Sequence, residues 1–474
     1  MLARAQFALT IMFHYLFPPL SIGLGGLIVV MEALFLIRKD RDYEKLARFF
    51  TRLFAVNFAV GVASGIVMEF QFGTNWASYS RYVGDVFGSA LAAEGIFAFF
   101  LESGFLAVLV FGWDRVGPRM HFFSTLMVFL GSVFSSVWIV IANSWQQTPA
   151  GHHIVGEGGN ERAEIIDFWA MVFNPSAMHR LGHVLLGAFV VGGFFVMSIS
   201  AFYVLRGRHL PLATKSFKVS YVYALVASLL LFVSGHSQAV AVAHNQPAKI
   251  AAFEGHYKTG PAPLWLVGMP DDATKEVRGG IGIPGLLSFL VHGDTKAYVK
   301  GLDDFPPEDR PPTKVPFLAY HLMIGLGSLH VGLLALGAFF LRKGRIFQKR
   351  WLLRAFVVAV VGPYLANEAG WVSAEVGRQP WAVYGLLRTK DAVSKVVPSE
   401  HIVTSIVTFA LLYSALFFIW LFVMNEKIKH GPADDEEVPS FRVPDRLSDV
   451  ASMRADPASP ASLTLPRAES KETP

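Results

Sequence analysis

The feature that most constrains this chain is a series of apolar segments long enough to cross a lipid bilayer. A helix needs roughly 20 apolar residues to span the hydrocarbon core. Because backbone groups in lipid must be satisfied internally, such segments fold as helices. The sequence therefore predicts an all-α polytopic membrane protein with a bundle of nine transmembrane helices. The segments are Phe7–Ile37, Leu53–Phe72, Val86–Trp113, Phe122–Ser144, Arg180–Leu205, Val219–Ala241, Pro316–Leu341, Leu353–Val376 and Ile402–Val423.

The composition agrees with a membrane protein. Of the 474 residues, 53% are hydrophobic and 16% are charged, whereas about a quarter of a soluble domain is charged. The net charge of +5 would suggest nucleic acid in a soluble protein, but here the basic residues lie in short loops, and no nucleic-acid partner is expected. The chain has no cysteine, which excludes disulfides, iron–sulfur clusters and thiolate ligation. Any metal must be held by His, Met or carboxylate.

The loops that follow the odd-numbered segments are rich in Lys and Arg, and the others are poorer for their length. Cytoplasmic loops carry this excess in membrane proteins, which predicts an N-terminus outside and a cytoplasmic C-terminus. The basic residues after the first, third, fifth and seventh segments are Arg38, Lys39, Arg41, Lys45, Arg48 and Arg52; Arg115 and Arg119; Arg206, Arg208, Lys215 and Lys218; and Arg342, Lys343, Arg345, Lys349, Arg350 and Arg354.

Four regions follow from this pattern. Residues 1–241 hold the first six helices, and residues 316–425 hold the last three. Residues 242–315 form a long external loop with enough Pro, Gly and charge to fold, and loops of that length are commonly functional. Residues 426–474 are rich in Pro, Ser, Asp and Glu, which predicts a disordered cytoplasmic tail.

Ionisable groups within the apolar segments ask for an explanation, because a charge at a helix centre costs roughly 2.5–3.5 kcal/mol. Glu94 and Glu102 lie eight residues apart in the third segment, about two turns along one face. They could relay protons, joined by Ser103, or form a neutralised pair without a role. Glu368 lies in the eighth segment, in a run that must bury its charges against partners.

A histidine near the N-terminus stands beside a predicted helix break. His14 precedes Pro18 and Pro19, which free backbone carbonyls and kink a helix, as often happens beside a buried site. From chemistry alone, His14 is a metal ligand or a histidine hydrogen-bonded to a neighbouring carbonyl, with even weight.

Two further segments carry candidate ligands. His179 and His183 are four residues apart at the start of the fifth segment, so they share a helix face; they hold one metal together, or only one of them is a ligand. Met323 lies near the start of the seventh segment. Its thioether is a packing group, or it pairs with a histidine across the bundle as an axial ligand that raises a haem's potential.

These residues lie in stretches that resemble subunit I of cytochrome bd-type quinol oxidases, over nearly the whole chain up to about residue 425. Two of the stretches, around Met68–Trp76 and Glu368–Trp381, are long and specific. The matching stretches are Arg4–Thr10 (RAQFALT) with His14 downstream, Met68–Trp76 (MEFQFGTNW), Glu94–Ser103 (EGIFAFFLES), Gly112–Arg115 (GWDR), Asn174–His183 (NPSAMHRLGH), Lys249–Glu254 (KIAAFE) and Glu368–Trp381 (EAGWVSAEVGRQPW).

The resemblance implies a set of haems and their ligands. The family carries two b-type haems, one low-spin and one high-spin, and usually a haem d, with a further haem b in its place in some members. His183 and Met323 match the axial ligands of the low-spin b haem. His14 and Glu368 match axial ligands of the paired high-spin centre where oxygen is reduced, and which of them binds which haem stays unassigned.

The resemblance also implies the reaction and the partners. A quinol is oxidised at the external face, where Lys249 and Glu254 match the residues used. O2 is reduced to water with cytoplasmic protons, which creates a proton motive force without pumping. Glu94 matches an acidic residue beside the high-spin centre, and Glu102 and Ser103 match the proton path. In the inner membrane, the expected partners are subunit II of the oxidase, a small single-span subunit in some members, and the lipid bilayer.

The chain departs from the family pattern in two places. The family often has Arg two residues before the Met ligand, where this chain has His321. We therefore expect His321 to be a propionate partner or a spare ligand. The external loop is short for the family and resembles the short-loop branch, which includes cyanide-insensitive forms.

Two other functions fit the residues alone. A proton-coupled transporter would use the buried carboxylates, but the inverted repeat typical of such transporters is not evident in the sequence. A non-catalytic haem-binding membrane protein would use the same ligands without turnover.

Overall fold

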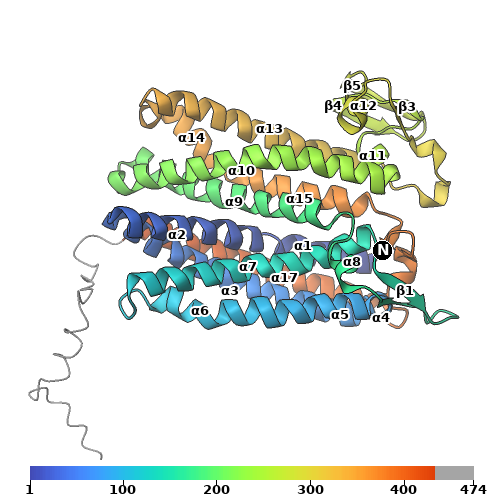
Figure 1. Ribbon diagram of the computed structural model, residues 1–474, viewed down its shortest axis with the longest axis horizontal. Helices are drawn as coiled ribbons and strands as arrows, with labels where there is room; N and C mark the ends of the chain where they lie inside the picture. The colour runs from blue at the N-terminus through green and yellow to red at the C-terminus, as the bar shows by residue number, and fades with distance from the viewer. Residues whose placement is uncertain (433–474) are drawn as a thin grey trace, which may run out of the picture. The chain divides into compact units, whose positions relative to one another are not determined.

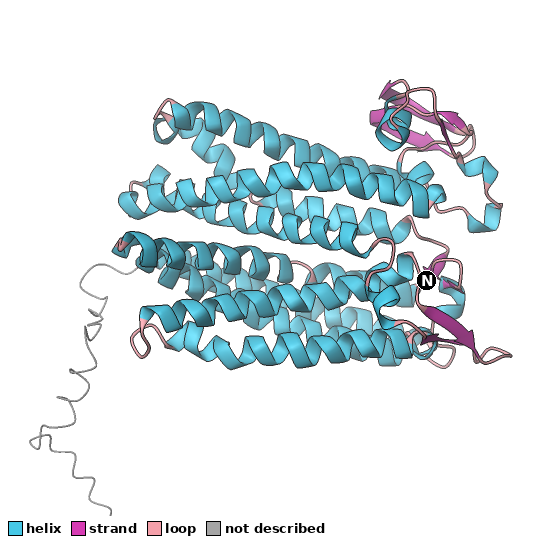
Figure 2. Cartoon of the chain, in the orientation of Figure 1, coloured by secondary structure: helices cyan, strands magenta, loops and turns pink. Residues whose placement is uncertain are grey.

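The computed structural model describes residues 1–432, which form a long bundle of helices (Figures 1 and 2). Within this part, nine helices are long and apolar enough to cross a membrane, which confirms the predicted all-α bundle. They are α1 (Leu2–His14) with α2 (Pro18–Arg38), α3 (Arg41–Thr74), α5 (Gly84–Ala93) with η1 (Glu94–Phe99) and α6 (Phe100–Phe111), α7 (Pro118–Gln147), α9 (Ala177–Arg206), α10 (Leu210–Asn245), α13 (Lys314–Arg342), α14 (Arg350–Val358) with α15 (Val361–Val376), and α17 (Ser399–His430).

The remaining elements are short and lie in the connections. The strands form two-stranded antiparallel sheets: β1 (His152–Val155) with β2 (Arg162–Ile165), β3 (Gly260–Pro261) with β6 (Tyr298–Val299), β4 (Leu264–Asp271) with β5 (Glu276–Ile283), and β7 (Trp381–Val383) with β8 (Leu387–Arg388). The short helices are α4 (Ala77–Tyr82), α8 (Phe168–Val172), α11 (Pro247–Phe253), α12 (Leu286–His292), η2 (Leu302–Asp304), η3 (Pro307–Asp309), η4 (Ile346–Gln348) and α16 (Thr389–Ala392).

The first span is broken between α1 and α2, directly after His14. The prolines that start α2 cannot donate backbone hydrogen bonds, and side chains satisfy groups at the break. Nδ2 of Asn57, on α3, donates to the carbonyl of Phe17 at 2.8 Å and to Oγ of Ser21 at 2.9 Å. The predicted break beside His14 is therefore present and is stabilised from the next helix.

Two other spans are irregular. The third span contains a π-helical stretch, η1, that begins at Glu94; such stretches often occur at functional sites. The eighth span breaks between α14 and α15. There, Oγ of Ser198 donates to the carbonyl of Val357 at 2.7 Å, and Nε2 of His330 lies 3.3 Å from the carbonyl of Ala359. Polar side chains thus meet the carbonyls that this break exposes.

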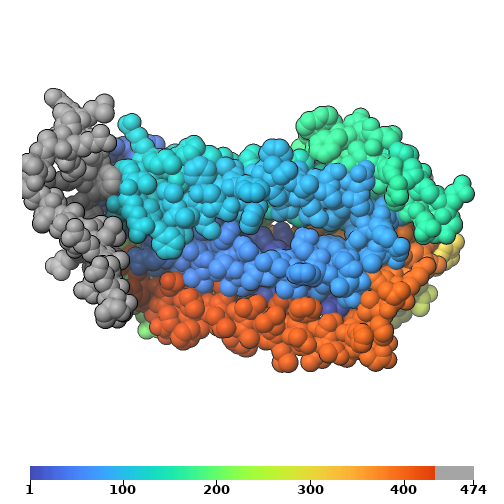
Figure 3. Space-filling view, turned by 90° about the horizontal axis from the view of Figure 1, so that it is seen from below, coloured from blue at the N-terminus to red at the C-terminus, as the bar shows by residue number. Residues whose placement is uncertain are grey.

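Helix α9 is the centre of the bundle, and α17 lies on its outside. In the most apolar stretch of α9, 72% of the residues are buried, against 6% in α17. Figure 3 shows α17 lying along one face of the molecule beside α3. Large apolar side chains of α17, such as Phe418 and Phe422, are exposed, as expected of a surface that contacts lipid or another membrane chain.

The segment predicted as an external loop folds into α11, α12 and short strands between α10 and α13. Figure 1 shows these elements at the same end of the bundle as the N-terminus, opposite the basic turns α2–α3, α6–α7, α9–α10 and α13–α14. The predicted tail begins at residue 426, but α17 continues to His430. The rest of that tail lies outside the described residues.

Candidate functional site

His14 is the last residue of α1, and its ring lies against α3. Nδ1 of His14 is 3.0 Å from Oγ of Ser64, which is fully buried. A Cβ on Gly65 would lie 3.2 Å from Cε1 of the ring, so a glycine at this position lets the imidazole approach the α3 backbone. His14 is therefore held by a polar contact on one side and is not simply packed in the core.

His183 lies one turn after His179 on α9 and faces α10. Nδ1 of His183 is 3.5 Å from Oγ of Ser234, a long contact, and a Cβ on Gly235 would lie 3.6 Å from Cε1 of His183. His179 is exposed and its Nδ1 is 2.8 Å from Oγ of Ser237. The two histidines are thus in different environments, and His183 is the one directed into the bundle.

Met323 packs against Gly370 of α15. A Cβ atom added to this glycine would lie only 2.8 Å from Sδ of Met323. His321 precedes it by two residues, and both of its ring nitrogens face backbone carbonyls. Nδ1 is 2.8 Å from the oxygen of Phe317, and Nε2 is 2.9 Å from the oxygen of Trp265. This geometry does not favour the expected role of His321 as a spare ligand or a propionate partner. Instead, His321 connects α13 to strand β4.

Sequence neighbours of the candidate ligands on different helices meet at Trp371, which sequence reasoning did not single out. The ring of Trp371 lies 5.4 Å from that of Tyr15, the residue after His14. The guanidinium of Arg180, one turn before His183, lies 5.5 Å from the same ring. Glu368 lies one turn before Trp371, and its Oε1 is buried without a hydrogen-bond partner in the described part of the chain.

Glu375, further along α15, lies in a buried polar network. Its Oε1 accepts from Nδ2 of Asn143 and Nε2 of Gln147, each at 3.1 Å. It pairs with Arg378 and lies 3.8 Å from Arg180. The Glu375 side chain is 32% exposed, whereas those of Arg180 and Arg378 are 6% and 8% exposed. Part of Glu375 therefore faces a space that the protein atoms leave open beside this network.

Lys249 joins this network from α11, where it is 2% exposed. Its Nζ donates to Oε1 of Gln246 at 2.5 Å and to the side-chain oxygen of Gln147. Burial lowers the pKa of Lys249 well below its usual value, and the nearby charges of Arg180 and Arg378 lower it further, while Glu375 opposes them. The site thus combines several cationic side chains with one carboxylate, a set that suits an anionic or electron-rich ligand.

Glu254 caps the other end of α11 and points away from this network. It is fully buried, and no side chain within residues 1–432 donates a hydrogen bond to its carboxylate; the backbone N–H of Trp265 lies close enough to lower its pKa. Nε2 of His321 lies 4.0 Å from Oε2. Burial raises the pKa of Glu254 from 4.5 to about 8. Lys249 and Glu254 therefore serve opposite faces of α11 and are not brought together.

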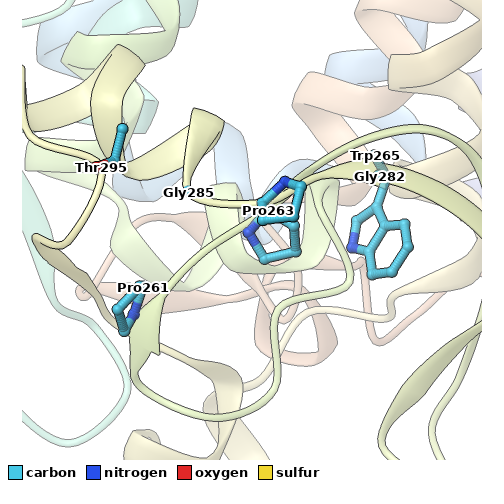
Figure 4. Close-up of a pocket in the computed structure, with 7 residues that line it drawn as sticks. Pro261, Pro263, Trp265, Gly282, Gly285 and Thr295 are labelled. Carbon is cyan, nitrogen blue, oxygen red and sulfur yellow. The ribbon is translucent and has the colours of Figure 1, made fainter.

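An open hollow lies beside Glu254's neighbour Trp265, in the external loop (Figure 4). It has a volume of about 550 Å³, within the range of about 300–1,000 Å³ that is usual for small-ligand sites. The lining residues are Pro261, Pro263, Trp265, Gly282, Pro284, Gly285 and Thr295. Since the Trp265 carbonyl also contacts His321, the wall of this hollow is connected to the surroundings of Glu254.

Glu94 and Glu102 each receive a hydrogen bond from a serine of α7. Oγ of Ser135 donates to Glu94, and Oγ of Ser132 donates to Glu102, each at 2.5 Å. The carboxylates also lie close enough to interact electrostatically. Ser103 is exposed and is not part of this arrangement. The third span thus carries a pair of carboxylates whose partners come from α7.

The chemistry of these donors fits haem. His14, His183 and Met323 supply the ligand types that proteins use for haem iron, and each lies opposite a glycine that leaves room for it. Glu368 adds a buried oxygen without a partner. Within the described residues, no group of three or more His, Asp or Glu is placed to hold a bare metal ion.

Sequence reasoning missed several of these residues for different reasons. Ser132 and Ser135 are spaced by three residues on an apolar helix, a signal that could have identified them as partners of the paired carboxylates. Glu375 lies in the quoted EAGWVSAEVGRQPW stretch and is a carboxylate inside an apolar segment, a signal that could have identified it, whereas no local pattern distinguishes Trp371. Ser64 carries no sequence signal, because only the fold brings it to His14.

Comparisons with known proteins identify the family of the chain. Residues 2–432 match the family described as "Cytochrome bd terminal oxidase subunit I". The chain is 40% identical to cytochrome bd ubiquinol oxidase subunit 1 of Bacillus subtilis, over 92% of this chain and 94% of that protein. It is 33% identical to cytochrome bd-II ubiquinol oxidase subunit 1 of Escherichia coli, over 91% of this chain and 96% of that protein.

A comparison with solved structures agrees with the sequence comparisons. The structure of bd oxidase from Geobacillus thermodenitrificans superposes with a TM-score of 0.84 and 29% sequence identity, covering 91% of this chain and 98% of that chain. The resemblance noted in the sequence is therefore confirmed, and the chain belongs to the cytochrome bd terminal oxidase subunit I family.

Proposed function

We propose that this chain is the haem-binding subunit of a terminal quinol oxidase. It takes electrons from a quinol at the outer face of the bacterial inner membrane and delivers them to O2, which becomes water with protons from the cytoplasm. Protons released outside and consumed inside create a proton motive force without pumping. The observation that carries this proposal is the meeting at Trp371 of Tyr15 and Arg180, which stand next to His14 and one turn before His183, in a member of a terminal oxidase family.

The family resemblance supports three of the proposed haem ligands. We assign His183 and Met323 to a low-spin haem b, and His14 to one haem of the high-spin pair, which holds a second haem b and a haem d, or a further haem b in its place. Bound haems supply electron transfer and the reduction of O2. The protein supplies the ligand atoms and the low-dielectric surroundings that exclude water from them.

Helix α15 offers two carboxylates for the remaining high-spin ligand. Glu368 is our first candidate, because its Oε1 is buried without a partner in the described part of the chain. Glu375 is the second candidate, because its side chain keeps 32% exposure beside buried arginines. The variants Glu368→Gln and Glu375→Gln distinguish them, since only loss of the true ligand removes the signal of one high-spin haem while the low-spin signal stays.

The quinol site is placed at the external loop. The buried carboxylate of Glu254 can accept a proton from a quinol hydroxyl, and the hollow beside Trp265 is large enough for a ring. Lys249 lies on the opposite face of α11 and anchors this helix to Gln147 on α7. We therefore assign the proton acceptor role to Glu254 and a positioning role to Lys249.

The proton path from the cytoplasm uses Glu102 and then Glu94. Ser132 and Ser135 keep both carboxyl groups hydrogen-bonded in the apolar interior. Ser103, which the family resemblance includes in this path, is exposed on α6. If Ser103 takes part in the proton path, it does so in contact with a partner chain that covers this surface of α6.

The proposed oxidase also has a defined orientation in the membrane and defined partner subunits. The basic turns lie at the end opposite the external loop and the N-terminus (Figure 1), which supports an N-terminus outside and a cytoplasmic C-terminus. The exposed apolar face around α17 supports contact with subunit II and, where present, with a small single-span subunit. Quinol and O2 are the substrates.

Absorption spectroscopy and oxygen uptake of the purified complex test the proposal together. We expect b-type bands after reduction with dithionite, and quinol-dependent O2 consumption. His183→Ala should remove the low-spin b signal, and Glu102→Gln should keep all haem signals while oxygen uptake falls. A colourless protein would instead indicate a proton-coupled transporter, and a coloured protein without oxygen uptake would indicate a non-catalytic haem-binding protein.

A further inference from the structure

The position of His14 at the end of α1 leaves its ring without support from its own helix. The chain breaks directly after it, and α2 begins at Pro18. The neighbours of the ring therefore come from α3, where Gly65 leaves space for the imidazole and Ser64 meets Nδ1 at 3.0 Å. The carbonyl of Gly61, one turn earlier on α3, also lies against the ring.

The hydroxyl of Ser64 has one proton and two carbonyl acceptors within reach. Its Oγ lies 2.9 Å from the oxygen of Val60 and 3.0 Å from that of Gly61. Serines inside helices commonly donate to the carbonyl three or four residues earlier. If Ser64 donates there, its oxygen can only accept from His14, so Nδ1 carries the proton. The lone pair of His14 is then on Nε2.

The same face of α1 is joined to α3 by two more buried contacts. Nε2 of Gln71 donates to Oγ1 of Thr10 at 2.6 Å, and Nδ2 of Asn75 donates to the side-chain oxygen of Gln6. Gln6, Thr10 and His14 are spaced by four residues, which places them on one helix face. The His14–Ser64 contact is therefore the last of three contacts along this face of α1. The other two, at Gln6 and Thr10, hold α1 against α3 without touching the imidazole of His14.

We infer that Ser64 is a positioning residue for His14: its hydroxyl accepts the Nδ1 proton and so directs the lone pair of Nε2 toward haem iron. This inference rests on the proposed function, in which His14 is a haem ligand. Hydrogen bonds to the second nitrogen of a ligating histidine fix its tautomer and raise its basicity. A more basic ligand favours the ferric state, so Ser64 also lowers the midpoint potential of the haem that His14 binds.

The test uses resonance Raman spectroscopy and redox titration of the reduced, purified complex. His14→Ala first identifies the iron–histidine stretching band. Ser64→Ala should lower the frequency of that band and raise the midpoint potential of that haem, because the ligand loses its hydrogen-bond acceptor. Ser64→Thr keeps a hydroxyl and should restore both values. Thr10→Val removes the neighbouring α1–α3 contact and should change neither value.

The outcomes distinguish the claim that His14 is a haem ligand from the claim that Ser64 positions it. If His14→Ala leaves every iron–histidine band in place, His14 is not a ligand and the assignment in the proposed function is wrong. If the band depends on His14 but Ser64→Ala leaves its frequency and the midpoint potential unchanged, the role of Ser64 is contradicted. Equal shifts in Ser64→Ala and Thr10→Val would also contradict it, because they would reflect a loosened α1.

Discussion

Glu102 and Glu254 are both buried carboxylates, but only Glu102 accepts a hydrogen bond from another side chain. Oγ of Ser132 lies 2.5 Å from Glu102, inside the membrane-spanning bundle. Glu254 lies at the external end, where no side chain of the residues described donates to it and only the backbone N–H of Trp265 lies close enough to lower its pKa. A buried carboxyl group without a partner carries the full cost of desolvation, about 1–3 kcal/mol or more.

The difference indicates different uses of the same functional group. Glu102 is held in place by the protein itself, as suits a residue that passes protons along a fixed path. Glu254 lacks such support, so its surroundings are completed only by a molecule that brings a donor. A quinol hydroxyl is such a donor. The comparison therefore supports the proposed quinol site at Glu254 and the proposed proton path through Glu102.

The comparison predicts that the largest effect comes from Glu254→Gln. The amide cannot accept a proton from the quinol, and general base catalysis typically contributes about 10²–10⁴-fold. We expect quinol-dependent oxygen uptake to fall by about this factor, while dithionite still reduces every haem. Glu276→Gln, an exposed carboxylate in the same loop, is the matched control and should keep full activity. Normal uptake in Glu254→Gln would remove the proposed distinction.

The pH dependence of quinol oxidation gives the next largest effect. Burial raises the pKa of Glu254 to about 8, so the carboxylate that accepts the proton predominates only above that pH. We expect kcat/KM for quinol to fall about tenfold per pH unit below this value. Glu254→Gln should lose this dependence. A wild-type profile that is flat between pH 6 and about 9 would show that Glu254 is not the acceptor.

The stability of the protein should change in the opposite direction. The pKa of Glu254 is raised above its ordinary value of 4.5, so the folded protein holds a proton that the unfolded chain has released. Stability therefore decreases as the pH rises from 4.5 through about 8, because the buried carboxylate must ionise. The pH that favours quinol oxidation is thus the one at which this site destabilises the fold.

The sequence predicted the bundle well because span length and apolarity are local properties. The nine segments correspond to the nine apolar helices of the described residues. The break after His14 was also predictable, since Pro18 and Pro19 act on their own backbone. Helix ends were less predictable, as α17 shows by continuing to His430.

The site was predictable only where the residue type itself carries chemistry. His14 could be singled out because a histidine in an apolar segment needs a reason, whereas Glu254, in the external loop, was indicated only by the family resemblance. Ser64 could not, because it is 50 residues from His14 in sequence and only packing joins them. Ser103 follows Glu102 directly, so it projects about 100° away around the helix and is exposed in this chain; its expected place in the proton path stays a prediction.

The smallest expected effect on oxygen uptake comes from removing the hydrogen bond that Ser132 donates to Glu102. Ser132→Ala removes the hydrogen bond to this carboxyl group, and a single such bond contributes about 1 kcal/mol. We expect oxygen uptake to slow by about fivefold, with an unchanged KM for quinol and unchanged haem spectra. Ser136→Ala is the matched control, because Oγ of Ser136 donates only to the carbonyl of Val133. An equal loss in both variants, or a raised KM for quinol in Ser132→Ala, would mean that α7 affects activity through packing and not through Glu102.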